Sequence, residues 1–147
     1  MKIVAAKSAG FCFGVRRAVE KVDGLLDSGE KVCTLGPIIH NPQTLERLKR
    51  RGVRVVFSPE EVPGGSVLVI RSHGVGRSEL ENIKSCGVRF CDATCPFVEK
   101  IHRIVEKASG EGKTVLIAGD RTHPEVRGIE GYCRGECHVF QSAGQLS

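Results

Sequence analysis

The sequence predicts an α/β fold of repeated parallel-sheet units, and three features carry this prediction. Short β-rich runs alternate with helical patterns along the 147 residues. The runs VLVI and VLIA are continuously apolar, which is typical of parallel strands covered on both faces. The third feature is an internal duplication, in which cysteine, helix, strand, histidine, helix and strand occur twice in the same order.

Each element follows from its local pattern. The helix expected over 14–27 has an apolar stripe at helical spacing, formed by Val15, Ala18, Val19, Val22, Leu25 and Leu26. Similar reasoning predicts helices over 42–51, 77–85, 96–109 and 124–133. Strands are expected over 2–6, 31–35, 53–57, 66–72, 88–93, 113–119 and 137–141.

The duplication has an offset of 83 residues, which is the separation of Cys12 and Cys95. The same offset superposes His40 on His123 and Gly36 on Gly119. Both cysteines precede a predicted helix, and both histidines follow the carboxyl end of a predicted strand, where open parallel sheets bind ligands. We therefore expect one shared site between two units. The second unit stops before its equivalent of strand 66–72, so we expect the chain to be part of a longer, three-unit protein.

Composition narrows the function classes. The net charge of +5 suits an anionic ligand or a solvated basic surface, and the absence of Trp argues against base-stacking platforms for single-stranded nucleic acid. No run is long enough for a signal peptide or a membrane span. Seven cysteines without a secretory signal favour metal or redox use over disulfides. We therefore expect a cytoplasmic protein without a nucleic-acid or membrane partner.

Five motifs in this order resemble the IspH/LytB family of 4-hydroxy-3-methylbut-2-enyl diphosphate reductases, which are iron–sulfur oxidoreductases of the methylerythritol phosphate route. The resemblance covers the whole chain. The motifs that carry it are Gly10-Phe11-Cys12-Phe13-Gly14-Val15, Leu35-Gly36-Pro37-Ile38-Ile39-His40-Asn41, Ile70-Arg71-Ser72-His73-Gly74-Val75, Asp92-Ala93-Thr94-Cys95-Pro96 and Gly119-Asp120-Arg121-Thr122-His123-Pro124-Glu125-Val126.

The resemblance implies a trefoil of three α/β units around a central [4Fe–4S] cluster. By motif position, Cys12 and Cys95 would be metal ligands, and His40, His73 and His123 would bind the substrate. Glu125 would be catalytic and relay a proton. The reaction would reductively remove the hydroxyl of the diphosphate substrate and give isopentenyl and dimethylallyl diphosphate, with ferredoxin or flavodoxin as electron donor.

The resemblance also divides the chain. Residues 1–13 would hold an N-terminal strand that packs on a third unit, together with the loop of the first cluster cysteine. Residues 14–95 would form the first unit, and 96–147 an incomplete second unit. Because the third cysteine and other site residues would lie beyond this sequence, we expect the 147 residues alone to be inactive.

A different function class stays open at this stage. The pairs Cys91/Cys95 and Cys133/Cys137 have a spacing that a four-thiolate zinc site can use, which would make the chain a zinc-stabilised α/β module binding anions or nucleic acid. The other cysteines are expected to be ordinary thiols, and His102 is expected to be solvated. His73 alone could be a turn residue, and Glu125 alone could be a helix-start acid.

Overall fold

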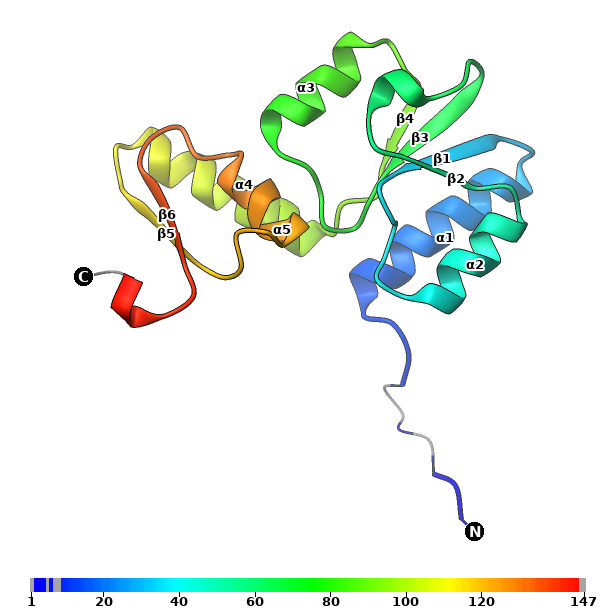
Figure 1. Cartoon of the computed structure of the whole chain (residues 1–147), viewed down its shortest axis with the longest axis horizontal. Helices are drawn as coiled ribbons and strands as arrows, with labels where there is room; N and C mark the ends of the chain where they lie inside the picture. Colours follow the sequence, from blue (N-terminus) through cyan, green and yellow to red (C-terminus); the bar gives the residue numbers. More distant parts are fainter. Residues whose placement is uncertain (1, 5, 7–8, 146–147) are drawn as a thin grey trace.

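The computed structural model describes residues 2–4, 6 and 9–145, and it confirms the α/β prediction with two parallel sheets (Figure 1). The larger sheet has the order β2-β1-β3-β4, and all of its pairings are parallel. Its strands are β1 (Lys31–Leu35), β2 (Arg54–Val56), β3 (Ser66–Ile70) and β4 (Phe90–Asp92). The sequence predicted all four strands, and three of the predicted ranges extend one to two residues beyond the observed strand ends.

The larger sheet is covered on both faces because alternate residues of its central strands point to opposite sides. On one side, Val32 and Val69 pack in a buried cluster with Ala18 and Leu48 of the helices α1 (Phe13–Asp27) and α2 (Pro42–Arg50). On the other side, a second cluster contains Cys33, Leu35, Leu68 and Ile70 together with Ile83 of α3 (Arg77–Ser85). This explains why VLVI is apolar throughout.

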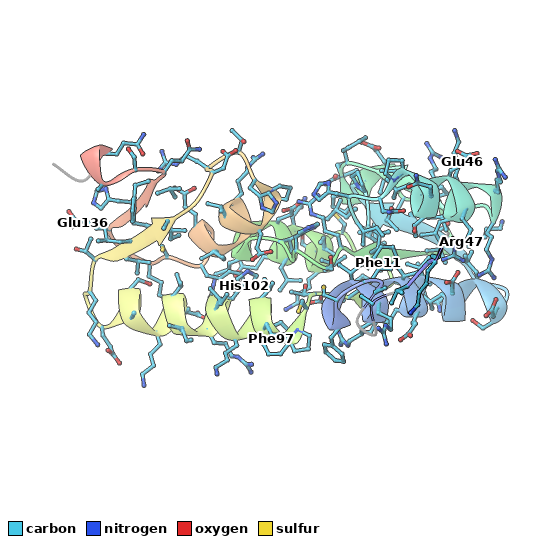
Figure 2. The ribbon with its side chains drawn as sticks, turned by 90° about the horizontal axis from the view of Figure 1, so that it is seen from below. Phe11, Glu46, Arg47, Phe97, His102 and Glu136 are labelled. Carbon is cyan, nitrogen blue, oxygen red and sulfur yellow. The ribbon has the colours of Figure 1, made fainter. Side chains whose placement is uncertain are left out.

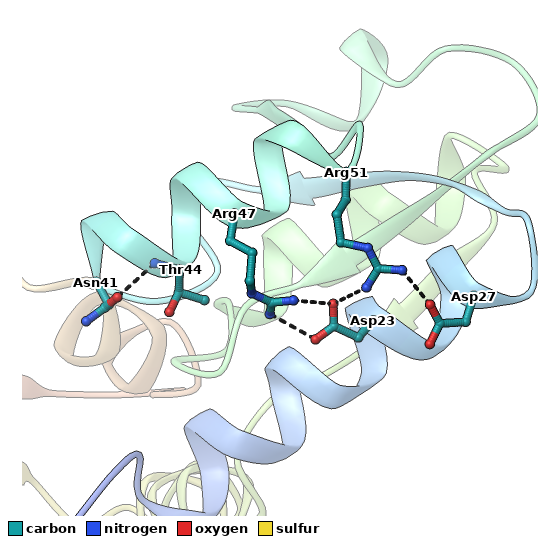
Figure 3. Close-up of polar contacts among 6 residues, drawn as sticks. All are labelled: Asp23, Asp27, Asn41, Thr44, Arg47 and Arg51. Atoms are coloured by element: carbon teal, nitrogen blue, oxygen red, sulfur yellow. Dashed lines mark hydrogen bonds and ion pairs between the residues drawn. The ribbon is translucent and has the colours of Figure 1, made fainter.

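The helices α1 and α2 are also joined by ion pairs at the surface (Figure 3). Asp23 accepts hydrogen bonds from Arg47 at 2.9 Å and from Arg51 at 2.5 Å, and Arg51 also contacts Asp27. The Arg47 hydrogen bond is the main reason that the pKa of Asp23 is lowered. The helix α2 begins where Asn41 accepts a hydrogen bond from the Thr44 amide at 2.9 Å.

The second group of elements repeats the first. It contains α4 (Pro96–Gly110), β5 (Val115–Ala118), α5 (Pro124–Glu130) and β6 (Cys137–Phe140), with β5 and β6 paired in parallel. Shifting α1 by 83 residues reproduces the bounds of α4, and β1 and β2 fall on β5 and β6 in the same way. The duplication therefore holds at the level of structure. The boundaries 1–13, 14–95 and 96–147 stay a prediction.

The expected strand over 2–6 is not formed by the residues of that segment that the structure describes. Ile3 and Val4 are 82% and 78% exposed, because no strand within the described part of the chain lies beside them. A strand needs a neighbour for its backbone hydrogen bonds, which local sequence cannot supply. Packing of this segment on a third unit stays a prediction. None of the described helices has the length and apolar character to span a membrane.

Candidate active site

Three histidines meet at the carboxyl ends of three strands. His40 lies in the loop after β1, His73 follows β3, and His123 follows β5. Their potential ligand atoms all lie within 4.8 Å of one another. The ring centroids of His40 and His73 are 4.9 Å apart, and His123 lies 6.1 Å and 5.7 Å from them. The two units thus share one site, as the sequence predicted, with His73 as the third member.

Hydrogen bonds between loops hold this cluster in place. The Ser72 hydroxyl, next to His73, donates to the Ile38 carbonyl in the loop of His40 at 3.5 Å. The Ser72 carbonyl in turn accepts from the Cys95 amide at 3.0 Å. Gly74 has φ +73°, a backbone conformation that favours glycine, and its amide closes a tight turn on the Arg71 carbonyl. The loop of His73 is therefore hydrogen-bonded both to the loop of His40 and to the start of α4 at Cys95.

His73 is neutral at physiological pH in this setting. Burial is the main cause that lowers its pKa to about 4, and positive charge on His40, His123 and Arg71 lowers it further. Its Nδ1 atom is buried and has no hydrogen-bond partner among the described residues. Burial and the neighbouring positive charges thus both favour the neutral form of His73.

This shift predicts how stability depends on pH. The ordinary histidine pKa is 6.5, so between pH 6.5 and about 4 the unfolded chain binds a proton at His73 that the folded chain does not. The free energy of unfolding should therefore be highest above pH 6.5 and decrease as the pH falls towards 4. Urea denaturation of the wild type and His73→Gln at pH 7.0, 6.0 and 5.0 measures this. The variant should have the shallower slope, and equal slopes would contradict the prediction.

His123 presents a donor to the site because of its backbone contacts. It caps the N-terminus of α5, and its Nδ1 accepts a hydrogen bond from the Glu125 amide at 3.2 Å. Neutral imidazole has one acceptor and one donor nitrogen, so the proton of His123 lies on Nε2. A metal ligand needs a free lone pair, whereas an anion needs a donor. This tautomer makes the three-histidine cluster better suited to an oxyanion than to a metal ion.

Cys12 and Cys95 hold equivalent places at the starts of α1 and α4. Both thiols are free, and each cysteine is the residue that caps its helix. Cys95 packs against the first turn of α1, where an added Cβ on Gly14 would lie 2.5 Å from the Cys95 Sγ. The amide groups and the partial positive charge of a helix N-terminus suit metal-bound thiolates. The pair thus fits a metal centre to which both units contribute one thiolate.

Side chains of α1 hold the loop before Cys95. Arg17 donates to the Thr94 carbonyl at 2.9 Å, and Lys21 donates to the Asp92 carbonyl at 2.6 Å. Phe13 and Phe97, each close to one of the two cysteines, form an edge-to-face pair with centroids 6.5 Å apart. These contacts fix the start of α4 against the start of α1.

The contact between Gly14 and Cys95 gives a stability prediction. Gly14→Ala should lower the free energy of unfolding by about 1–3 kcal/mol, because the new methyl group overlaps the Cys95 side chain. Gly24→Ala on the same helix is the matched control. It meets nothing within 4 Å and should be neutral or stabilising by up to about 1 kcal/mol. Equal effects in urea denaturation would show that Gly14 is not in close contact with Cys95.

A repeated turn places one cysteine and one histidine of the site, and the sequence reasoning missed it. Residues 92–96 and 120–124 both follow the pattern Asp-x-Thr-Cys/His-Pro. In each, the aspartate accepts from the threonine amide two residues later at 2.8 Å. The next residue caps a helix whose first turn contains the proline. The recurrence of this pattern outside the 83-residue register was the available signal.

His102 is buried, which corrects the expectation that it is solvated. Its exposed fraction is 4%, and its ring stacks on Tyr132 with centroids 4.3 Å apart. Figure 2 shows His102 on the side of α4 that faces α5. Added Cβ atoms on Gly74 and Gly128 would lie 2.9 Å and 3.6 Å from this ring. His102 therefore fills the space between the loop of His73 and the helix of His123, which a short helical pattern could not reveal.

The four-thiolate zinc site is not assembled by the residues that the structure describes. There, the three histidines are the sole group of three or more side chains with metal-ligand spacing. Cys133 and Cys137 lie next to each other in the core of the second unit, where burial raises the pKa of Cys133 to about 12. A thiol that resists deprotonation is a poor zinc ligand. Burial also raises the pKa of Cys33, as expected for an ordinary core thiol.

Glu125 lies half-buried in the first turn of α5, two residues after His123. Its amide fixes the His123 ring, and its carboxylate does not belong to the three-histidine cluster. Its position is compatible with both expectations, a helix-start acid and a proton relay beside the cluster. The roles of Glu125, the histidines and the two cysteines stay predictions.

These features define an α/β protein of repeated parallel-sheet units, with a three-histidine cluster at one sheet edge and a free cysteine at the N-cap position of each of two equivalent helices. The chain belongs to the LytB protein family, whose model matches residues 3–146. This agrees with the motifs singled out in the sequence.

Named relatives extend this assignment. A 4-hydroxy-3-methylbut-2-enyl diphosphate reductase of Geobacter sulfurreducens is 46% identical over 147 residues, and one from another Geobacter species is 45% identical over 142 residues. These alignments cover 100% and 97% of this chain but 52% and 50% of the relatives. The chain thus spans about half the length of the curated relatives it matches.

Two solved structures share the fold. One is (E)-4-hydroxy-3-methyl-but-2-enyl diphosphate reductase, the terminal enzyme of the non-mevalonate pathway, with 42% identity and a TM-score of 0.85 over 99% of this chain and 53% of that one. The other is the E-1-hydroxy-2-methyl-but-2-enyl-4-diphosphate reductase of Plasmodium falciparum, with 28% identity and a TM-score of 0.89 over 95% and 44% of the two chains.

Proposed function

We propose that this chain forms the first unit and part of the second unit of a 4-hydroxy-3-methylbut-2-enyl diphosphate reductase that serves isoprenoid precursor biosynthesis. The observation that carries the proposal is the meeting of His40, His73 and His123 at one sheet edge, in a chain whose relatives bear this name. Because the chain spans about half the length of these relatives, the activity is proposed for a protein of the relatives' length.

The histidine cluster supplies the binding chemistry for the diphosphate. His123 donates from Nε2 even when it is neutral, because its Nδ1 is occupied by the Glu125 amide. His73 gains a proton more easily once phosphate oxygens lie beside it, since the approaching negative charge opposes the causes that lower its pKa. Binding of the diphosphate should therefore be accompanied by proton uptake and should strengthen as the pH falls from 8 to 6.

Cys12 and Cys95 would hold two irons of a [4Fe–4S] cluster, and a third thiolate would come from the remainder of the protein. When bound, such a cluster supplies the electrons for the reaction. The two cysteines suit this role because their thiols are free, both are the N-cap residues of equivalent helices, and Cys95 packs against Gly14 in the first turn of the helix that Cys12 begins. A small donor protein such as ferredoxin or flavodoxin would deliver the electrons.

Glu125 would supply the proton that allows the substrate hydroxyl to leave as water. The net reaction consumes two electrons and two protons, replaces the C–O bond by C–H and releases one water. The product is isopentenyl or dimethylallyl diphosphate. Glutamate is chemically suited to this transfer where it lies close to the reacting oxygen. We also propose a cytoplasmic location and no membrane or nucleic-acid partner.

Metal analysis and turnover test this function. A protein of the relatives' length, purified without oxygen, should contain iron and sulfide in equal amounts, appear brown and consume 4-hydroxy-3-methylbut-2-enyl diphosphate with a chemical reductant. The 147-residue chain should show no turnover. Stoichiometric zinc without iron would refute the proposal and restore the zinc-stabilised binding module.

A further inference from the structure

We propose that a second cavity, next to the three-histidine cluster, is a phosphate-binding subsite formed by Arg71, Ser78, Glu79 and Arg127. The inference extends the proposed function, because this subsite would receive a phosphate group or a free phosphate ion in addition to the diphosphate at the histidines. The cavity has a volume of about 450 Å³, and its wall is made by the loop after β3, the start of α3 and one side of α5.

Arg71, which lines this cavity, has guanidinium N–H donors that no described residue accepts. Its Nη1 donates to the Leu35 carbonyl at 3.3 Å, which fixes the guanidinium against the loop of His40. Its Nε is buried and has no hydrogen-bond partner among the described residues. A guanidinium has five N–H donors in a fixed planar arrangement, and the Leu35 carbonyl occupies one of them. The Nη2 group, for which the described residues provide no hydrogen-bond partner, is the donor that an oxyanion in the cavity would use.

Arg127 brings the second positive charge. It lies on the exposed side of α5, and within the described residues its side chain forms no ion pair or hydrogen bond. Arg121, just before the same helix, is by contrast neutralised by Glu130 at 2.9 Å. An arginine left without a carboxylate partner beside a cavity with a second arginine creates a positive field suited to an anion.

The position of the cavity links it to the histidine cluster. Arg71 lies two residues before His73, and Arg127 lies four residues after His123, one helical turn along α5. Pro124, the neighbour of His123, lines the cavity. Both arginines are therefore carried by the segments that carry two of the three histidines, so the two anion sites share their framework.

Glu79 selects phosphate over other oxyanions. Glu79 lines the same cavity, and its negative charge there would repel a fully ionised anion such as sulfate. Hydrogen phosphate retains a P–O–H group, which donates to a carboxylate while its other oxygens accept from the two guanidiniums and the Ser78 hydroxyl. A mixed set of two cations, one hydroxyl and one acceptor thus matches phosphate better than sulfate or a carboxylate.

Titration calorimetry of the 147-residue chain with inorganic phosphate and with sulfate tests the subsite. The wild type should bind phosphate at least tenfold more tightly than sulfate. Arg127→Gln should weaken phosphate binding at this subsite at least tenfold, while Arg121→Gln, the matched control, leaves it unchanged. Glu79→Gln should tighten sulfate binding and abolish the preference for phosphate.

A second pair of variants separates this inference from the proposed function. His40→Ala and His123→Ala should abolish pyrophosphate binding at the histidine cluster and leave the phosphate signal that depends on Arg127. If phosphate binding is lost in the histidine variants and unaffected by Arg127→Gln, all phosphate binds at the histidines and the subsite does not exist. Equal affinity of the wild type for phosphate and sulfate would also overturn the proposal.

Discussion

Cys12→Ser and Cys95→Ser should each reduce the iron content severalfold in a protein of the relatives' length that is purified without oxygen. Both cysteines are N-cap residues where α1 contacts α4, and iron–sulfur clusters depend on thiolate ligands, which a serine hydroxyl replaces poorly. Iron and sulfide analysis together with the absorbance of the cluster measures the loss.

Cys33→Ser and Cys86→Ser are the controls for these two variants. Cys33 is 2% exposed within the core on the α3 side of the sheet, and Cys86 is exposed at the end of α3. Both should retain iron at the wild-type ratio in the folded protein. Equal loss of iron in all four variants would mean that Cys12 and Cys95 are not the ligands, whatever their agreement with the 83-residue repeat.

Glu125→Gln should retain the cluster and substrate binding and lower the turnover rate about 10²–10⁴-fold, because an amide cannot deliver the proton that the leaving hydroxyl needs. The backbone amide of residue 125 still holds the His123 ring in this variant, so binding at the histidines should persist. Single-turnover kinetics with a chemically reduced enzyme separates this chemical step from electron delivery.

Glu130→Gln is the matched control, since Glu130 lies at the other end of α5 and pairs with Arg121. Its turnover should be close to that of the wild type, with at most a small loss of stability from an exposed ion pair. Near-normal turnover of Glu125→Gln would exclude Glu125 as the proton relay, and a loss of substrate binding would assign it to binding instead.

Local sequence predicted most of the fold because each element has its own signal. The apolar run of β3 is buried on both faces, as expected, and the starts of α2, α4 and α5 are set by an N-cap residue followed by proline. The expectation of two covered faces is wrong for β5, where Ile117 is buried but Leu116 is 55% exposed because the described residues cover only one face of the smaller sheet. The 83-residue repeat predicted that His40 meets His123 and that Cys12 and Cys95 hold equivalent places at the starts of two helices, since duplicated units place equivalent residues at equivalent edges.

The features that were missed depend on contacts between distant segments. The burial of His102 is set by Tyr132 and by two glycines that lie far from it in sequence. The segment 2–6 has strand propensity, but pairing needs a neighbour that the described residues do not provide. The tautomer of His123 rests on a single hydrogen bond from the Glu125 amide, which no periodicity can indicate.

The shared turn of residues 92–96 and 120–124 shows that one backbone framework can be fitted with different chemistry. At the capping position, a sulfur in one copy and an imidazole in the other project from the same aspartate–threonine turn and the same proline-led helix. If the proposed roles of Cys95 and His123 hold, exchange of a single side chain at this position changes a metal ligand into an anion ligand while the main chain is preserved. The turn therefore gives protein engineers a position at which the side chain before the helix can be exchanged while the main chain is kept.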